Sequence, residues 1–248
     1  MKNFVLAFFA SMLLTLTSFG GPPSIMKDHG IKTPVDSFGF VIVLTFIKDI
    51  NCDEKDCEYE QRIATASSVV VLKTKNITRL LTAGHVCAAV EDGPTHIVIK
   101  DFYGKSHDAA AQVYSEKPDI CLVETIDSWG TPLKISRKNP EHGDHLWNMA
   151  SPFGIFNESL LLTFEGIYSG KGTDESDWYT IPAAPGSSGS PIINHRGEIV
   201  GIIHSAFMNL PHIAISSSTE QIRSFLKKAN YELDFRQEDE KVHNESSQ

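Results

Sequence analysis

The stretch Gly186-Ser187-Ser188-Gly189-Ser190-Pro191 interrupts a series of short apolar segments with a turn built from small residues. Glycine permits the tight backbone that such a turn needs, and the serine at its centre presents a hydroxyl group. A turn of this kind also leaves backbone N–H groups free to face a developing oxyanion. Taken alone, the hexapeptide is equally well a plain turn, so its meaning depends on the rest of the chain.

Two upstream segments supply the chemistry that a serine nucleophile needs. They read Thr82-Ala83-Gly84-His85-Val86-Cys87 and Pro118-Asp119-Ile120-Cys121-Leu122-Val123. A base, His85, and a carboxylate, Asp119, therefore precede Ser188, each at the edge of a β-type apolar run. Asp108 is a competing carboxylate, but it lies in a polar turn, whereas Asp119 opens an apolar strand. We expect His85, Asp119 and Ser188 to meet as a catalytic triad, with the N–H groups of Gly186 and Ser188 forming an oxyanion hole.

Short apolar segments separated by turns predict two sets of β-strands. The first set covers residues 39–47, 64–73, 78–82, 95–100, 110–114 and 120–125, and the second covers 133–135, 145–149, 160–168, 178–181, 190–194, 198–204 and 213–216. Ser218-Thr219-Glu220-Gln221 is typical of a helix start, and Ile222, Phe225 and Leu226 then repeat at helical spacing. The pattern predicts an all-β fold of two six-stranded antiparallel β-barrels, with the active site between them, plus a C-terminal α-helix.

The predicted domain organisation follows from these elements. It comprises a signal peptide at 1–20, a first barrel at 36–128 carrying the histidine and the aspartate, a second barrel at 129–217 carrying the serine, a helix at 218–230 and a disordered acidic tail at 231–248. The N-terminal region has a basic residue, an apolar run and then small residues, which is the layout of a secretory signal. We therefore expect a secreted or periplasmic protein, with an uncleaved membrane anchor as the alternative.

Composition excludes some partners. The formal net charge of −9 argues against nucleic-acid binding, which needs an excess of Lys and Arg to neutralise phosphates. Four cysteines fit an exported protein. We expect the pairs Cys52–Cys57, which bracket a charged hairpin tip, and Cys87–Cys121, which lie two residues after His85 and Asp119. Two buried free thiols near the site are the alternative to the second pair. Neither a metal site nor a cofactor is expected.

The ordered motifs resemble those of trypsin-like serine peptidases of the chymotrypsin superfamily, and within it the HtrA-type protease domain. The resemblance covers most of residues 62–228. It rests on the segments Thr82–Val86, Asp119–Val123, Gly143-Asp144 with Ala150–Gly154, Ala183–Pro191 and Gly197–Ile202. Ser187 and Ser190 depart from the family pattern, but both are small, so we expect catalysis to be intact. We expect no PDZ-like domain, so HtrA-style peptide sensing, trimer caging and a chaperone role are not carried over.

The resemblance implies a serine endopeptidase that acts on polypeptides through an acyl-enzyme. Its substrate-binding residues are expected to be Pro182, Ala183, Ile203, His204, Ser205 and Ala206. Strand alternation aims Ile203 rather than His204 into the pocket for the P1 side chain, the residue on the acyl side of the scissile bond. This favours a small or aliphatic P1. The alternatives are a glutamate-specific enzyme that uses His204, a catalytically silent peptide-binding pseudoprotease and an esterase-like acyl transferase. The oligomeric state stays open.

Overall fold

Alternation of side chains along β1 (Phe38–Lys48) gives the strand two buried faces. Val41 and Val43 point into one apolar cluster, whereas Phe38 and Phe40, on the opposite face, belong to another. A strand with this pattern cannot lie on an open surface, because both of its faces need cover. The computed structural model describes residues 33–48, 59–88, 95–207 and 209–230, and within them β1 is part of a closed barrel.

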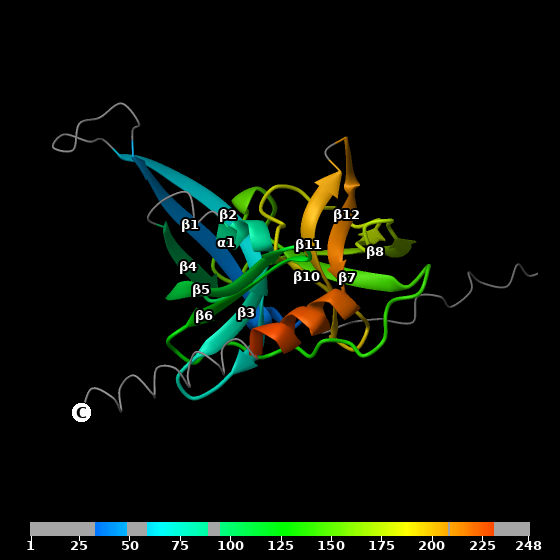
Figure 1. Ribbon diagram of the computed structural model, residues 1–248, viewed down its shortest axis with the longest axis horizontal. Helices are drawn as coiled ribbons and strands as arrows, with labels where there is room; N and C mark the ends of the chain where they lie inside the picture. Colours follow the sequence, from blue (N-terminus) through cyan, green and yellow to red (C-terminus); the bar gives the residue numbers. More distant parts are fainter. Residues whose placement is uncertain (1–32, 49–58, 89–94, 208, 231–248) are drawn as a thin grey trace, which may run out of the picture. The chain divides into compact units, whose positions relative to one another are not determined.

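The first barrel closes in the order β1-β2-β3-β6-β5-β4, with all neighbours antiparallel. Its other strands are β2 (Tyr59–Lys73), β3 (Thr78–Thr82), β4 (Thr95–Asp101), β5 (Ser106–Glu116) and β6 (Asp119–Thr125). A short 3-10 helix, η1 (Val35–Ser37), precedes β1, and a single helical turn, α1 (Gly84–Ala88), follows β3. The outer part of the β1–β2 hairpin extends beyond the barrel (Figure 1).

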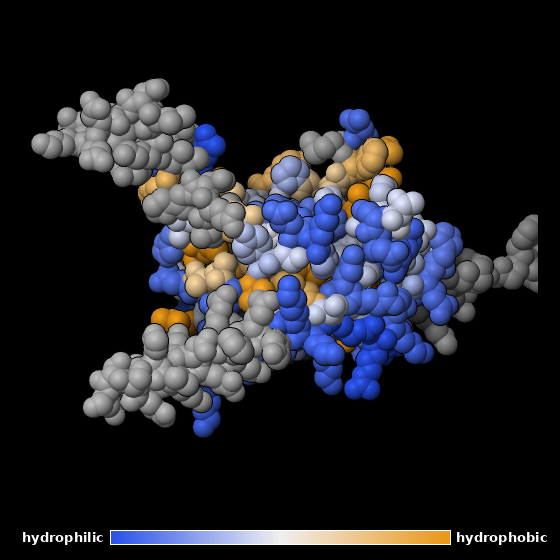
Figure 2. Space-filling model, in the orientation of Figure 1, coloured by the Kyte–Doolittle hydropathy of each residue, from blue (hydrophilic) through white to orange (hydrophobic). Residues whose placement is uncertain are grey.

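The second barrel closes in the order β10-β11-β12-β9-β8-β7, again with antiparallel neighbours. Its strands are β7 (His145–Ala150), β8 (Leu162–Lys171), β9 (Asp177–Tyr179), β10 (Pro191–Ile193), β11 (Ile199–Phe207) and β12 (Leu210–Ser218). A 3-10 turn, η3 (Pro152–Gly154), follows β7. The β11–β12 hairpin projects from this barrel, and apolar surface lies just below its hydrophilic tip (Figures 1 and 2). Phe207 and Leu210 are exposed near this end of the hairpin.

A helix over residues 219–230 follows β12 and packs against the barrels. Ser218 and Gln221 form a reciprocal cap, in which each backbone N–H donates to the other's side chain. Ile222, Phe225 and Ala229 are buried in a cluster that also holds side chains from β1 and β10. The predicted all-β class with two barrels and a C-terminal helix is therefore confirmed.

One predicted strand is wrong. Residues 133–135 form no barrel strand but a connection between the barrels, in which Ile135 makes an isolated parallel bridge to Ile199. Leu133 N–H donates to the Val70 carbonyl, 2.9 Å away in the first barrel, so the segment is tied to both barrels and joins neither sheet. The predicted leader, the Cys52–Cys57 pair and the acidic tail lie outside the described residues. Within the described part, none of the helices is long and apolar enough to cross a membrane.

Candidate active site

The turn that carries Ser188 is folded by its own backbone. Ser187 N–H donates to Ala184 O at 2.8 Å, and Ser190 N–H donates to Ser187 O at 3.0 Å. Gly189 lies at φ +85°, and a β-carbon there would overlap Ser67 O and the hydroxyl of Thr82. Glycine is therefore required at this position, both for its backbone angle and for the close approach of the first barrel. The result is a serine hydroxyl presented at the contact between the two barrels.

His85 lies on α1, directly after β3, and contacts both partners expected from the sequence. Its Nδ1 lies 2.8 Å from Asp119 Oδ2, and its Nε2 lies 3.0 Å from Ser188 Oγ. A carboxylate only accepts hydrogen bonds, so the proton of a neutral imidazole belongs on Nδ1. Nε2 is then the acceptor that faces the Ser188 hydroxyl. The structure thus brings the three predicted residues together in one hydrogen-bonded row.

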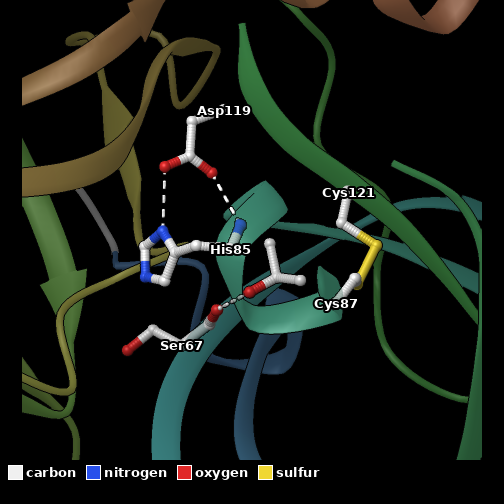
Figure 3. Close-up of a disulfide and its surroundings, with 6 residues drawn as sticks. Ser67, His85, Cys87, Asp119 and Cys121 are labelled. Carbon is white, nitrogen blue, oxygen red and sulfur yellow. Dashed lines mark hydrogen bonds and ion pairs between the residues drawn. A yellow bond between two sulfur atoms is a disulfide. The ribbon is translucent and has the colours of Figure 1, made fainter. Parts of the chain in front are cut away.

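Asp119 begins β6 and uses both carboxylate oxygens on the same residue. Oδ1 accepts the backbone N–H of His85 at 2.8 Å, while Oδ2 contacts the ring (Figure 3). Partial burial would raise the pKa of Asp119, but the hydrogen bonds and charge of His85 outweigh burial and hold this pKa below its ordinary value. The carboxylate therefore stays ionised and fixes both the position and the tautomer of the imidazole.

The N–H groups of Gly186 and Ser188 donate to no acceptor among the described residues. The Pro185 carbonyl, at the other end of the same peptide unit, accepts the N–H of Phe153 from η3. Because the peptide is planar and trans, this bond turns the Gly186 N–H in the opposite direction. Two N–H groups on the nucleophile turn are thus available for an oxyanion, as expected for this type of turn.

The structure contains the Cys87–Cys121 disulfide that the sequence predicts. It joins α1 to β6, the two elements that carry His85 and Asp119 (Figure 3). Both cysteines are buried. The bond therefore closes a covalent loop with a sequence separation of 34 residues behind the His–Asp pair.

Two of the residues expected to bind substrate, Ala183 and Ile203, are buried in the same apolar cluster of the second barrel. His204 does not belong to this cluster, and the β11–β12 pairing has a bulge at this residue. Burial lowers the pKa of His204, although the nearby Asp119 opposes this effect.

The outer half of β11 has one free edge within the described residues. Ile203 still bonds the nucleophile turn, because its N–H donates to Ser190 O and its carbonyl accepts the Gly189 N–H. Beyond Ile203, β11 pairs with β12 and no longer with β10. Ser205 and Ala206 lie on this stretch, and Pro182 precedes the nucleophile turn. An unpaired strand edge of this kind can accept an extended peptide as an added strand.

Four further residues contact the site, and the sequence assigned a role to none of them, although three lie within the quoted motifs Thr82–Val86 and Ala150–Gly154. They are Ser67, Thr82, Ser151 and Phe153, which contact the nucleophile turn or its neighbours. The first three are buried hydroxyl residues in apolar surroundings. Phe153 is 74% exposed at φ +54°, an uncommon backbone angle for a bulky side chain. For Ser67 the only signal in the sequence was a polar residue inside an apolar run, which does not identify a partner. Among the described residues, no cluster of His, Cys, Asp and Glu is arranged to hold a metal ion.

Two closed six-stranded barrels, with a Ser–His–Asp row at their contact, define the architecture of a chymotrypsin-type peptidase domain. Residues 66–202, more than half of the chain, match the family described as the trypsin-like peptidase domain. The chain belongs to this family, and the resemblance predicted from its motifs is confirmed.

The chain is also similar to individual proteins. It is 28% identical over 154 residues to "Putative serine protease HhoA" from Synechocystis sp., a match that covers 58% of this chain and 37% of that protein. The chain therefore corresponds to well under two thirds of that relative's length.

Two solved structures show the same fold. The serine endoprotease from Yersinia pestis superposes with a TM-score of 0.62 at 18% identity, covering 81% of this chain and 65% of that chain. The active form of the Rv3671c protease from M. tuberculosis superposes with a TM-score of 0.61 at 15% identity, covering 79% of this chain and 82% of that chain.

Proposed function

We propose that the protein is a serine endopeptidase that hydrolyses peptide bonds through an acyl-enzyme. The observation that carries the proposal is the position of His85, whose two ring nitrogens contact Asp119 and Ser188 at 2.8 and 3.0 Å. A histidine held in this way can remove the serine proton at Nε2, while the carboxylate stabilises the resulting imidazolium. Membership of the trypsin-like peptidase family supports the same reading.

The chemical steps follow from these contacts. Ser188 Oγ attacks the carbonyl carbon of the scissile bond as its proton passes to His85. The N–H groups of Gly186 and Ser188 bind the oxyanion of the tetrahedral intermediate. The intermediate collapses when His85 gives its proton to the leaving amine, which leaves an ester on Ser188. A water molecule, deprotonated by His85, then hydrolyses the ester and restores the enzyme.

The proposed P1 preference is a small or aliphatic side chain. Ala183 and Ile203 are apolar, and Ile203 lies next to the nucleophile turn, where its carbonyl accepts the Gly189 N–H. Apolar residues at these positions favour an apolar pocket wall. The alternative is a glutamate preference in which His204 contacts the substrate carboxylate. Cleavage of a proteome-derived peptide library distinguishes them, because predominant cleavage after glutamate would reject the apolar pocket and favour His204.

We propose an exported protein with a leader at residues 1–20. A buried disulfide beside the site supports an oxidising compartment, because structural disulfides are rare in reducing ones. Sequencing the N-terminus of the mature protein tests this proposal. A mature chain that begins near Gly21 agrees with a cleaved leader, whereas one that retains the apolar run indicates the membrane-anchored alternative.

The decisive variant is Ser188→Ala. It removes the nucleophile and leaves the fold, so peptide hydrolysis should fall by about 10⁶-fold, to background. Covalent labelling by a fluorophosphonate should disappear together with the activity, as monitored by intact-protein mass spectrometry.

Ser187→Ala is the matched control, because this neighbouring hydroxyl accepts a hydrogen bond from the Ala184 N–H within the turn. It should retain fluorophosphonate labelling. Hydrolysis that persists in Ser188→Ala would reject the proposed mechanism. A wild-type protein that no acylating probe labels would favour a peptide-binding pseudoprotease. Cleavage confined to small esters would favour the acyl transferase.

A further inference from the structure

A buried serine of the first barrel holds the backbone beside the nucleophile of the second. Ser67, on β2, is fully buried. Its N–H donates to the carbonyl of Ser188 at 2.8 Å, and its own carbonyl accepts the Thr82 hydroxyl at 2.8 Å. The backbone of Ser67 is therefore fixed on two sides where the barrels meet. Figure 3 shows Ser67 on the side of His85 away from the Asp119 carboxylate.

The hydroxyl of Ser67 has three contacts, which lie across the barrel interface. It lies 2.9 Å from Gly186 O, 3.0 Å from Ser151 Oγ and 3.1 Å from Ser151 N. The Ser151 N–H can only donate and the Gly186 carbonyl can only accept. A serine hydroxyl has one proton, so the Ser67 proton must point at Gly186. Ser151 Oγ then directs its proton to Ser67 or to Ala66 O, which lies 3.3 Å away.

This contact completes the fixation of Gly186. The peptide on its N-terminal side is held by the bond from Phe153 N–H to Pro185 O. The peptide on its C-terminal side is held at its carbonyl by the Ser67 hydroxyl and at its N–H by Ala184 O within the turn. Glycine tolerates many backbone angles, so without these bonds the Gly186 N–H could turn away from the oxyanion position. With the three bonds in place, φ is held at +95°.

We propose that Ser67 is a positioning residue of the oxyanion hole. Its hydroxyl, supported by Ser151, holds the Gly186 carbonyl, so the oxyanion donor takes its position only when the two barrels are docked. The inference rests on the proposed peptidase function and adds a role for a residue that does not touch the substrate.

The test compares Ser67→Ala with Ser68→Ala. Ser68 is the adjacent serine on β2 and is equally buried, but its hydroxyl donates to Gly39 O within the first barrel. When the Gly186 carbonyl is no longer held, the Gly186 N–H stabilises the oxyanion less, and this oxyanion develops only in the transition state. The kcat of Ser67→Ala should therefore fall by about 10- to 100-fold, with KM within about two-fold of the wild type. Ser68→Ala should keep the kcat of the wild type even where its melting temperature is lower.

A transition-state analogue gives a readout that a general loss of stability would not move. A peptidyl trifluoromethyl ketone, built on the peptide that the wild type cleaves best, forms an oxyanion when Ser188 adds to it. Its inhibition constant should rise in Ser67→Ala by the same factor as kcat/KM falls, whereas inhibition by the product peptide should be unchanged. Ser67→Cys, with a weaker donor, replaces the alanine variant if that variant fails to fold, and Ser68→Cys is then the control.

The outcomes separate the two proposals. An active wild type, with a Ser67 variant whose kcat and inhibition constant match those of its Ser68 control, overturns the role of Ser67 alone. A wild type without hydrolysis or labelling at Ser188 overturns the peptidase function, and the role of Ser67 falls with it. A selective fall in kcat and in analogue binding supports both.

Discussion

The backbone at Gly186 leaves no room for any other residue. Gly186 lies at φ +95°, and a β-carbon there would lie 2.5 Å from Ser151 O and 3.0 Å from Phe153 N. Both neighbours belong to the segment that holds the Pro185 carbonyl. A side chain at position 186 must therefore displace either that segment or the peptide that carries the proposed oxyanion donor.

Gly186→Ala should abolish most of the activity, with kcat reduced by about 100-fold or more, because the donor N–H moves away from the oxyanion. Gly197→Ala is the matched control. Gly197 also has a positive φ, +71°, but a β-carbon there would meet no other atom within 4 Å. It should lose about 1 kcal/mol of stability with unchanged kcat. Steady-state kinetics and thermal melting test the pair, and equal kinetic losses in the two variants would contradict the steric argument.

The sequence predicts the Ser188, His85 and Asp119 side chains but not those that hold them. The former lie in short motifs whose letters are close together along the chain. Ser67 contacts Ser151 and Gly186, which are 84 and 119 residues away. Local patterns of hydrophobicity contain no information on such a partner. A serine inside an apolar run indicates only that its hydroxyl needs a hydrogen bond.

At the element scale, α1 and β6 are joined three times. The His85 side chain and its backbone N–H both bind Asp119, and Cys87 and Cys121 form a disulfide. The covalent loop limits how far the two elements can separate in the unfolded chain as well as in the folded one.

Replacing both Cys87 and Cys121 by alanine should lower the free energy of unfolding by about 3–4 kcal/mol, as the chain-entropy relation gives for a loop of this length. We expect a smaller effect on kcat, because the two hydrogen bonds to Asp119 remain. Urea denaturation of the oxidised wild type and of the variant measures the difference in the free energy of unfolding. Peptide hydrolysis at a temperature where both proteins are folded measures the effect on kcat. A variant as stable as the oxidised wild type would show that the bond contributes little.

Hydrophobic patterns in the sequence did not predict the start of β2 or the short helix α1. β2 begins at Tyr59 rather than at the predicted residue 64, and residues 61–64 are all exposed. Residues 59–61 pair with β1 beyond the stretch of β1 that also pairs with β4, and residues 62–64 lie at the end of that stretch. Residues 61–64 bury neither face of the strand, so no alternation appears in the sequence. α1 is a single turn, too short for a helical period to be recognised.

At the scale of the whole molecule, the barrels and the C-terminal helix share one apolar core. A single cluster contains Phe40 from β1, Ile202 from β11 and Phe225 from the helix. Two barrels could be predicted from the number and spacing of the strands. Their mutual placement could not, because it depends on which apolar faces remain uncovered after each barrel has closed. Since the triad is divided between the barrels, this shared core is a condition for the active site.

The second barrel also contains a buried acid that makes global stability depend on pH. Asp177, on β9, is almost fully buried and accepts a hydrogen bond from the Tyr168 hydroxyl at 3.0 Å. Burial raises the pKa of Asp177 to about 6, and Glu220 adds to this rise, whereas Tyr168, Lys171 and Tyr179 oppose it. Below this pKa the buried carboxyl is neutral and fits its surroundings. Above it, an ionised group must remain in the barrel.

The folded state therefore holds this proton more tightly than the unfolded chain, whose aspartates titrate near pH 3.9. Stability contributed by Asp177 is present below about pH 4 and is lost as the pH rises through about 6. Asp177→Asn lacks this titration, so its free energy of unfolding relative to the wild type should increase between pH 4.5 and 7.5, by at most about 2–3 kcal/mol. Urea denaturation across this range decides the matter, because a flat difference for Asp177→Asn would mean that this carboxyl stays ionised throughout.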